Sequence, residues 1–398
     1  MLLEKLVMDL QIKDSTIIEF LDLIGNNNTF STNLFSKSEF SKEDIQRILD
    51  KLLEMGIITV KYSYQCVKAE SVMNIAENLD SICKFCSKEV NHLNHYVKAK
   101  YSTRSKEIIK EIEGYEQQKI LKIVDEKYLH NLRLLKESLI KEKVIPFVGA
   151  GVSMPLGLPN WQGLIKICSD GLVGRDKKEF EELLDNNGDI FAAIDILINE
   201  SMTYNETNIK EKISAYIKIN FNTQVDNAFH NINDILNLNS DFYLTTNYDD
   251  ALSIYQRNGI YPFLLDEIEN LQDFFNEKQG RVVHLHGIYQ RPKTMVVSKK
   301  DYEQMYSDDK TKMLLSNMLS YKLLFIGFSF EDKYFKDIFT YVKEYIGGSH
   351  FIILFDVYGR NAQALKESGL HVISLKLENE FGYDHVDLIK ELFKYLLK

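Results

Sequence analysis

The sequence predicts an α/β protein in which a parallel, doubly wound sheet follows a small helical domain. From about residue 143 onward, short apolar runs typical of buried strands alternate with amphipathic helices, the order found in parallel sheets. Upstream of residue 70, apolar residues instead recur at helical spacing and lead into a β-rich segment. The chain has 398 residues, too many for one small core, so we expect two or three domains.

Composition narrows the class of protein. The net charge of −10 argues against a broad, non-specific nucleic-acid binder, because neutralising phosphates requires surplus Lys and Arg. No uninterrupted apolar run is long enough to span a bilayer, and the first residues become charged too early for a secretory signal. Four cysteines are too few for a disulfide scaffold. We therefore expect a cytoplasmic protein without a membrane segment.

Residues 1–70 are predicted to form a winged-helix-like domain. A short apolar helix over 16–24 ends at the turn that begins with Gly25. A second helix begins after Ser41, which is placed as its N-cap, and ends at Gly56. The β-rich segment 57–64 follows, and helices followed by a hairpin are similar to a winged helix. Such a domain binds either DNA or a protein, and the acidic chain favours a protein.

Residues 71–128 are predicted to be a helical linker region with a Cys/His knuckle. Cys83 and Cys86 are spaced as C-x₂-C, and His92 and His95 follow closely, so these four side chains could ligate zinc. The alternative is a helix in which the two cysteines are neighbours in a core. Residues 97–142 alternate charged and apolar residues at helical spacing, which favours solvated helices that link domains or contact another copy.

Residues 129–398 are predicted to form the parallel sheet. In such sheets, ligands bind beyond the carboxyl ends of the strands, so the residues after each strand are the candidates for a site. The strands are expected over 144–148, 242–245, 282–285, 323–326, 351–355 and 372–375.

A glycine loop follows the first expected strand, as Gly149-Ala150-Gly151-Val152-Ser153, with Gly157-Leu158-Pro159-Asn160-Trp161 behind it. Glycines let a backbone turn sharply, and the amides of the loop and of the next helix start can hold a pyrophosphate. The alternative is a tight turn. Met154 stands where a third glycine would complete G-x-G-x-x-G, which disfavours a classical dehydrogenase.

Polar residues follow the next two strands. Thr245-Thr246-Asn247-Tyr248-Asp249 offers hydroxyl, amide and carboxylate groups that could grip a ribose and orient a water, although Asn and Asp are also common helix N-caps. His284 and His286 share one face of their strand. His286 lies at the carboxyl end before Gly287 and is predicted to be the general base, and His284 is predicted to be structural.

The strand at 323–326 again ends in a glycine and a hydroxyl, Gly327 and Ser329. These two residues could close the site over phosphates or ribose. Glu331 is better explained as first-turn charge on the following helix.

Taken in order, these segments resemble the sirtuin-like family, which has a Rossmann-type sheet. That family carries a GAG-x-S loop followed by G-[IL]-P, then T-x-N-x-D, HG and G-x-S segments, and each has a counterpart between residues 149 and 329. The resemblance covers roughly residues 130–398. It implies that NAD⁺ is the ligand and that Asn247 and His286 are catalytic. It also implies NAD⁺ contacts from Gly149, Ala150, Gly151, Ser153, Pro159, Trp161, Thr246, Asp249, Gly327 and Ser329.

Two departures from the motifs of deacylating sirtuins narrow the part of the family that the chain resembles. Deacylating sirtuins carry a four-cysteine zinc site after the HG segment, whereas this chain has no cysteine after Cys168. The usual Asp-Phe-Arg after the proline is replaced by Asn160-Trp161-Gln162. Both features are similar to a bacterial sirtuin-like branch that hydrolyses NAD⁺ in antiphage defence, as is the segment Lys300-Asp301-Tyr302-Glu303-Gln304-Met305-Tyr306, in which Tyr302 could equally be packing.

The resemblance therefore implies an NAD⁺ glycohydrolase whose activity is controlled. We expect the control to act through the N-terminal region, with homo-oligomerisation and a companion defence protein, an ATPase or a nucleotide-processing enzyme. Nucleic acid is a less favoured signal. Two other functions remain open, a protein deacylase and a non-catalytic NAD⁺ or ADP-ribose sensor with a DNA-binding N-terminal domain.

Overall fold

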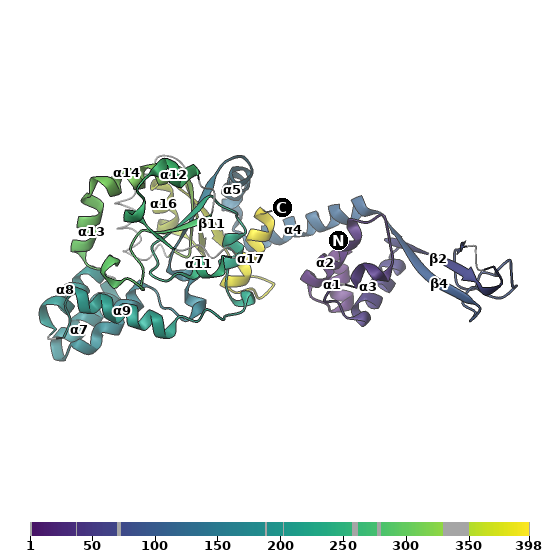
Figure 1. Cartoon of the computed structure of the whole chain (residues 1–398), viewed down its shortest axis with the longest axis horizontal. Helices are drawn as coiled ribbons and strands as arrows, with labels where there is room; N and C mark the ends of the chain where they lie inside the picture. The colour runs from purple at the N-terminus through teal and green to yellow at the C-terminus, as the bar shows by residue number, and fades with distance from the viewer. Residues whose placement is uncertain are drawn as a thin grey trace. The chain divides into compact units, whose positions relative to one another are not determined.

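The computed structural model describes residues 2–36, 38–69, 73–187, 189–201, 203–256, 262–276, 280–328 and 350–397. The chain folds into two compact units, Met1–Lys119 and Ile120–Lys398 (Figure 1). Each unit has its own core, so each is described by itself.

The N-terminal unit combines helices with an antiparallel sheet. Its first three α-helices are α1 (Leu2–Leu10), α2 (Asp14–Gly25) and α3 (Lys42–Glu54), and Phe20 of α2 stacks on Phe35 at 4.4 Å between ring centroids in their shared core. Ser41 caps α3 as predicted, because its hydroxyl accepts a hydrogen bond from the N–H of Asp44 at 3.0 Å. The sheet has the order β1-β4-β2-β3, with bounds Thr29–Phe30, His95–Thr103, Ile58–Cys66 and Met73–Ala76.

The region predicted as a helical linker is different in the structure. Residues 73–103 contribute β3 and β4 to the sheet, and β4 pairs with β2 along nine residues of each strand. The helical prediction for 97–103 was wrong because exposed and less exposed side chains alternate there with the period of a strand. Two helices do follow, α4 (Ser105–Ile123) and α5 (Leu129–Lys141). The expected boundary at residue 70 thus falls inside a sheet.

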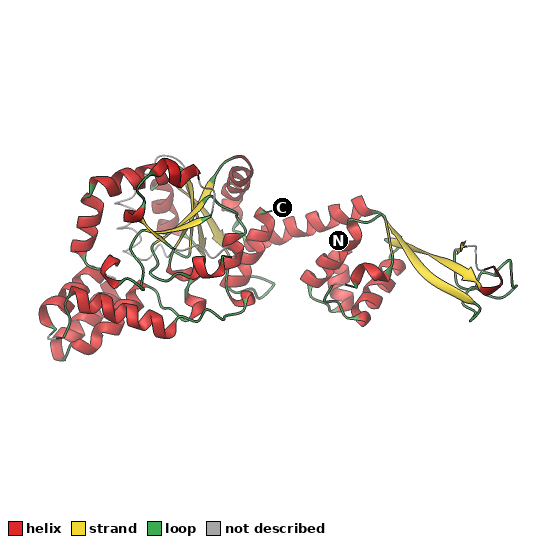
Figure 2. Cartoon of the chain, viewed as in Figure 1, coloured by secondary structure: helices red, strands yellow, loops and turns green. Residues whose placement is uncertain are grey.

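The C-terminal unit is built on a seven-stranded parallel sheet, which confirms the predicted fold class (Figure 2). All six expected strands are present, with ends that differ by at most two residues. β7 was not predicted, since it is only two residues long. In spatial order the strands are β11 (Leu370–Leu375), β10 (His350–Phe355), β9 (Lys322–Ile326), β5 (Val144–Val148), β6 (Phe242–Thr245), β8 (Arg281–His284) and β7 (Phe263–Leu264).

Helices cover both faces of this sheet because its strands are apolar on both sides. In β5, Val144 and Val148 point into one core, and Ile145 and Phe147 point into the other. The first core is closed by α5 with α10 (Ile232–Leu236), α11 (Ala251–Tyr255) and α17 (His385–Leu396). The second is closed by α12 (Leu271–Asn276), α13 (Lys299–Ser307), α14 (Asp309–Met318) and α16 (Gly359–Glu367).

A helical layer between β5 and β6 lies against the carboxyl ends of the strands. Its helices are α6 (Trp161–Lys166), α7 (Gly174–Glu182), α8 (Ile190–Glu200) and α9 (Glu206–Asn220). Their apolar faces share one cluster with Tyr248, which follows β6, and with Met295 and Val297, which follow β8. The layer therefore forms a wall beside the strand ends where a ligand is expected.

Within the described residues, no helix has the length and apolar character needed to cross a bilayer.

Candidate active site

The strand order reverses at β5, and this places the candidate site. The chain runs from β5 to β6 and β8 on one side, then returns to β9 and β10 on the other. Loops that leave such neighbouring strands diverge and open a crevice at their carboxyl ends. The glycine loop follows β5, Gly327 follows β9, and the segment from Thr246 to Asp249 follows β6.

The glycines let the loops after β5 and β9 touch. The N–H of Gly149 donates to the carbonyl of Ile326 and the N–H of Gly151 to that of Gly327, both at 2.8 Å. A methyl group on Gly151 would lie 2.9 Å from the Gly327 oxygen, and Gly327 itself has a φ of +76°. These two amides are therefore already bonded within the protein, in contrast to the prediction from the glycine loop that they hold a pyrophosphate.

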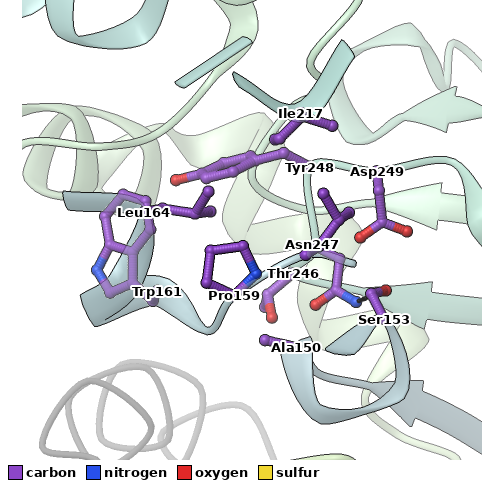
Figure 3. A pocket seen from close by; sticks show the side chains of 11 residues that line it. Ala150, Ser153, Pro159, Trp161, Leu164, Ile217, Thr246, Asn247, Tyr248 and Asp249 are labelled. Atoms are coloured by element: carbon purple, nitrogen blue, oxygen red, sulfur yellow. Dashed lines mark hydrogen bonds between the residues drawn. The ribbon is translucent and has the colours of Figure 1, made fainter. Parts of the chain in front are cut away.

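A small cavity of about 50 Å³ lies at this crevice (Figure 3). The structure brings seven of the predicted site residues to its walls, from the loops after β5 and β6. The cavity is also lined by four residues that the sequence did not single out as site residues, namely Leu158, Leu164, Ile217 and Tyr248. The predicted residues are Ala150, Ser153, Pro159, Trp161, Thr246, Asn247 and Asp249.

Asn247 is held in one orientation. Its Nδ2 donates to the Ser153 hydroxyl at 3.0 Å (Figure 3). It also donates to the carbonyl of Gly149 at 3.1 Å. Its backbone N–H donates to Oγ1 of Thr245 at 3.0 Å, and that hydroxyl donates to Val148 at the end of β5. The amide nitrogen is thus tied to the glycine loop, which also fixes the direction of the carbonyl oxygen Oδ1.

Asp249 is a buried carboxyl beside Asn247. Burial raises its pKa to about 6, although hydrogen bonds from Ser153 and from the N–H of Ala251 oppose the shift in pKa. Ser153 therefore bridges the amide of Asn247 and the carboxyl of Asp249. This carboxyl changes charge close to neutral pH, in contrast to an exposed aspartate.

An aromatic pair forms the wall on the helical side. The rings of Trp161 and Tyr248 meet edge to face with centroids 5.5 Å apart. The Tyr248 hydroxyl donates to the carbonyl of Val296 at 2.6 Å, so the ring is anchored at its far end. This wall is apolar and rigid, which suits a flat ring as ligand.

The two histidines have separate surroundings. Nδ1 of His284 lies 3.0 Å from the carbonyl oxygen of Asn247, and its buried Nε2 has no hydrogen-bond partner among the described residues. His286 is fully buried and does not line the cavity. Its Nε2 lies 2.9 Å from the hydroxyl of Tyr306 and its Nδ1 lies 3.3 Å from that of Tyr302. Burial lowers the pKa of His284 to about 4 and that of His286 to about 3, so both are neutral at pH 7.

Tyr302 and Tyr306 both contact His286, which the sequence alone did not indicate. Their spacing is the available signal, because residues four apart share one face of a helix, here α13. Both rings are buried against His286. Gly287 has a φ of +81°, and a methyl group there would lie 2.1 Å from the carbonyl of Thr294. The glycine after His286 is therefore required for the turn. Ser329, the last predicted contact, lies outside the described residues.

A second group of side chains lies in the N-terminal unit and could hold a metal ion. It consists of Cys66, Cys83, Cys86 and His95. The ligand set expected from the sequence named His92, which is not in this group. Cys66 takes its place because the β2–β4 ladder sets Cys66 directly opposite His95, a pairing that local spacing could not indicate.

Comparison with known proteins agrees with this geometry. Residues 241–373, from the residue before β6 into β11, match the model of the SIR2-like domain. The chain is 26% identical over 267 residues to the "NAD(+) hydrolase ThsA" of Cytobacillus dafuensis, covering 63% of this chain and 49% of that protein. The proteins of the same name from Bacillus cereus (strain MSX-D12) and Acinetobacter baumannii (strain 532279) are 27% and 24% identical, over 49% and 51% of this chain and 39% and 40% of theirs.

The chain thus spans about half the length, or less, of the curated relatives it matches. The matched segment holds Asn247, Asp249 and both histidines, whereas the glycine loop precedes it. The strands of the match belong to one continuous parallel sheet with β5. Residues 241–373 therefore match the SIR2-like domain model, and they share one sheet with β5, whose glycine loop lies outside the match.

Proposed function

We propose that this chain hydrolyses NAD⁺ to nicotinamide and ADP-ribose and that it does so as a regulated effector of antiphage defence. The observation that carries the proposal is the convergence of Asn247, Ser153 and Asp249 on one cavity at the strand-order reversal. Support for the substrate comes from the SIR2-like match and from relatives that are named NAD⁺ hydrolases. The role in antiphage defence is inferred from the sequence resemblance to the bacterial sirtuin-like branch described above.

Hydrolysis of the nicotinamide–ribose bond does not require a strong nucleophile. Nicotinamide leaves as a neutral ring from a cationic nitrogen, so the enzyme has to stabilise an oxocarbenium-like ribose and direct a water to it. In the proposal, Oδ1 of Asn247 accepts a hydrogen bond from that water, because Nδ2 already donates to Gly149 and Ser153. The carboxylate of Asp249 lies beside it and stabilises positive charge on the ribose.

His286 is proposed as the base. Its imidazole is neutral, so it can accept a proton, and Tyr302 and Tyr306 hold the ring through their hydroxyls. A base with so low a pKa is weak. His286 does not line the cavity, so in this proposal the bound substrate has to reach the imidazole beyond the cavity wall.

The size of the cavity determines which part of NAD⁺ these residues can hold. Its volume of about 50 Å³ is too small for the whole NAD⁺ molecule. We propose that it takes the nicotinamide–ribose end, with the nicotinamide ring against Trp161 and Tyr248. The bonded amides of Gly149 and Gly151 then position the loops, and other groups of the crevice meet the pyrophosphate.

The test is a turnover assay on the full chain. Purified protein, alone and with the products of neighbouring genes, is incubated with NAD⁺, and free nicotinamide and ADP-ribose are followed. Asn247→Ala and His286→Ala are expected to abolish product. Asn317→Ala changes an exposed asparagine of α14 and serves as the matched control with full turnover. The proposal fails if neither product appears under any condition, or if His286→Ala turns over as the parent does.

Two other functions predict different outcomes in the same experiment. A deacylase would make O-acetyl-ADP-ribose from NAD⁺ and an acetylated peptide, and the absence of cysteines after Cys168 opposes it. A non-catalytic sensor would bind NAD⁺ or ADP-ribose without releasing nicotinamide. Intact Asn247 and His286 favour catalysis.

Control is proposed to act through the N-terminal unit in the cytoplasm. The three helices with strands in the order β1-β4-β2 support a winged-helix-like domain. Its sheet and loops expose apolar side chains, which favours contact with a companion protein or a second copy over contact with DNA. These side chains are Met73, Ile75, Ile82, Leu93 and Tyr96.

A surface variant tests the control. Leu93→Ser is expected to change how the companion protein or self-association alters turnover, without changing the fold, because the Leu93 side chain is 98% exposed. Ile140→Ser, at an exposed apolar residue of the C-terminal unit, is the matched control. If the two variants behave equally in size-exclusion and turnover assays, activity is not regulated through the surface around Leu93.

A further inference from the structure

The tip of the N-terminal sheet carries a four-residue cluster that the proposed NAD⁺ chemistry does not use. Cys66 ends β2, His95 begins β4, and Cys83 and Cys86 lie in the connection between β3 and β4. Their ligand atoms, three sulfurs and one imidazole nitrogen, all lie within 4.8 Å of one another. We propose that Cys66, Cys83, Cys86 and His95 bind one structural zinc ion that closes this end of the sheet.

The donor set and its spacing fit zinc. Three thiolates and one imidazole form one of the usual four-coordinate sets of structural zinc sites. Zn–S bonds of about 2.3 Å in a tetrahedron separate the sulfurs by about 3.8 Å, which the cluster reaches with small movements. Sγ of Cys86 already lies 3.2 Å from Nε2 of His95, and all four cysteines of the chain are free thiols. Soft thiolates with imidazole disfavour calcium and magnesium.

The surroundings orient these groups as ligands. Nδ1 of His95 lies 3.1 Å from the carbonyl of Val90. That contact keeps the proton on Nδ1, so Nε2 presents its lone pair to the thiols. The N–H of Phe85 donates to Sγ of Cys83 at 3.5 Å, a contact that favours the thiolate. The ring of Tyr64 packs edge to face against His95 with centroids 5.3 Å apart.

The backbone brings the four residues together from two directions. The strand register places Cys66 opposite His95. The C-x₂-C turn is closed by the N–H of Cys83 donating to Lys88 at 2.8 Å and by the N–H of Ser87 donating to Cys83 at 2.9 Å. Two ligands therefore come from a strand pair and two from a tight turn, as in small zinc-binding modules.

The loop has too little apolar core to hold this shape alone. Among the residues that the structure describes, the cluster that anchors it has Tyr64, Cys66, Ala76, Cys83 and Val90 as its buried members. The large apolar side chains nearby, such as Ile82 and Leu93, are exposed instead. Small modules of this kind are stable when a metal or disulfides replace the missing core. A disulfide would use two of the three cysteines and leave the third as a free thiol.

Metal content of the full chain tests this proposal, and it needs no NAD⁺. Protein purified without chelator is expected to carry close to one zinc per chain by elemental analysis. Cys83→Ser and His95→Ala are expected to lose it. Two matched controls keep it: His92→Ala, because His92 is outside the cluster, and Cys168→Ser, because that thiol is buried in the other unit.

A second measurement covers variants that fail to fold. Cobalt(II) replaces zinc in the parent chain, and tetrahedral thiolate coordination gives intense visible bands. The proposal is supported if the parent shows those bands and His92→Ala shows them to the same extent. The proposal is overturned if the parent carries no metal and binds neither zinc nor cobalt, or if His92→Ala loses the metal while His95→Ala retains it.

Discussion

Replacing the buried carboxyl of Asp249 by an amide should stabilise the C-terminal unit while it removes activity. Folding raises the pKa of this carboxyl from 3.8 to about 6, because burial disfavours the charged form. The folded state therefore holds the proton more tightly than the unfolded chain. Its destabilising effect is absent below pH 3.8, grows as the pH rises, and is complete above about pH 6.

The magnitude follows from the two pKa values. The difference 6 − 3.8 corresponds to roughly 3 kcal/mol, at about 1.4 kcal/mol per pKa unit. Asp249→Asn removes this loss but weakens the hydrogen bond with Ser153, which costs about 1 kcal/mol. We expect the variant to be more stable than the parent by about 2 kcal/mol at pH 8. At pH 5 the advantage shrinks by roughly 1.4 kcal/mol, since about half of the effect is already present there.

The chain offers a local probe for this experiment. Trp161 is the one tryptophan of the sequence and lies in the wall of the cavity. Its fluorescence during urea unfolding at pH 5 and pH 8 reports on the C-terminal unit rather than on both units together. Asp195→Asn, at an exposed aspartate of α8, is the control and should show no pH-dependent gain. If Asp249→Asn is destabilised equally at both pH values, Asp249 is not a carboxylate that folding leaves charged in an apolar pocket.

The remaining predictions concern the loops, the base, the pH profile and the metal. Gly327→Ala should lower the melting temperature of the C-terminal unit, because its φ of +76° costs a side chain roughly 1–2 kcal/mol before any clash with Val152 is counted. Tyr306→Phe keeps the ring but removes the hydroxyl beside His286, and kcat for NAD⁺ cleavage should fall about tenfold. In a pH series, kcat/KM should decrease as the pH falls through about 6, where Asp249 takes up a proton, and a flat profile would exclude its ionised form from the reaction. Treatment with a chelator should release zinc and expose the N-terminal unit to limited proteolysis, while the C-terminal unit stays intact.

The parallel sheet was predictable because its signals are local. Each buried strand is a short apolar run, and the same residues form the strand in the structure, as at Val144 and Phe242. The residues that follow those strands could also be located, and three of them, Asn247, Asp249 and Ser153, line one cavity in the structure. Parallel strands bring their carboxyl ends to one edge, which converts residues far apart in sequence into neighbours.

The contacts that the sequence did not indicate form between residues that are far apart in the chain. The 58–66 and 95–103 strands form one ladder, and only that register places Cys66 opposite His95. The contacts of His286 with Tyr302 and Tyr306 depend on how α13 packs against the sheet. The bonded amides of Gly149 and Gly151 likewise require β9, whose loop approaches from residues almost two hundred positions later.

The central claim is that the cavity around Asn247 hydrolyses NAD⁺. The most direct measurement is the release of nicotinamide and ADP-ribose by the parent chain, by Asn247→Ala and by the exposed-site control Asn317→Ala, under the same activating condition. We predict equal amounts of the two products from the parent and the control, and none from Asn247→Ala. Turnover by Asn247→Ala equal to that of the parent would contradict the account, because the reaction would then proceed without the amide that the glycine loop and Ser153 hold in place.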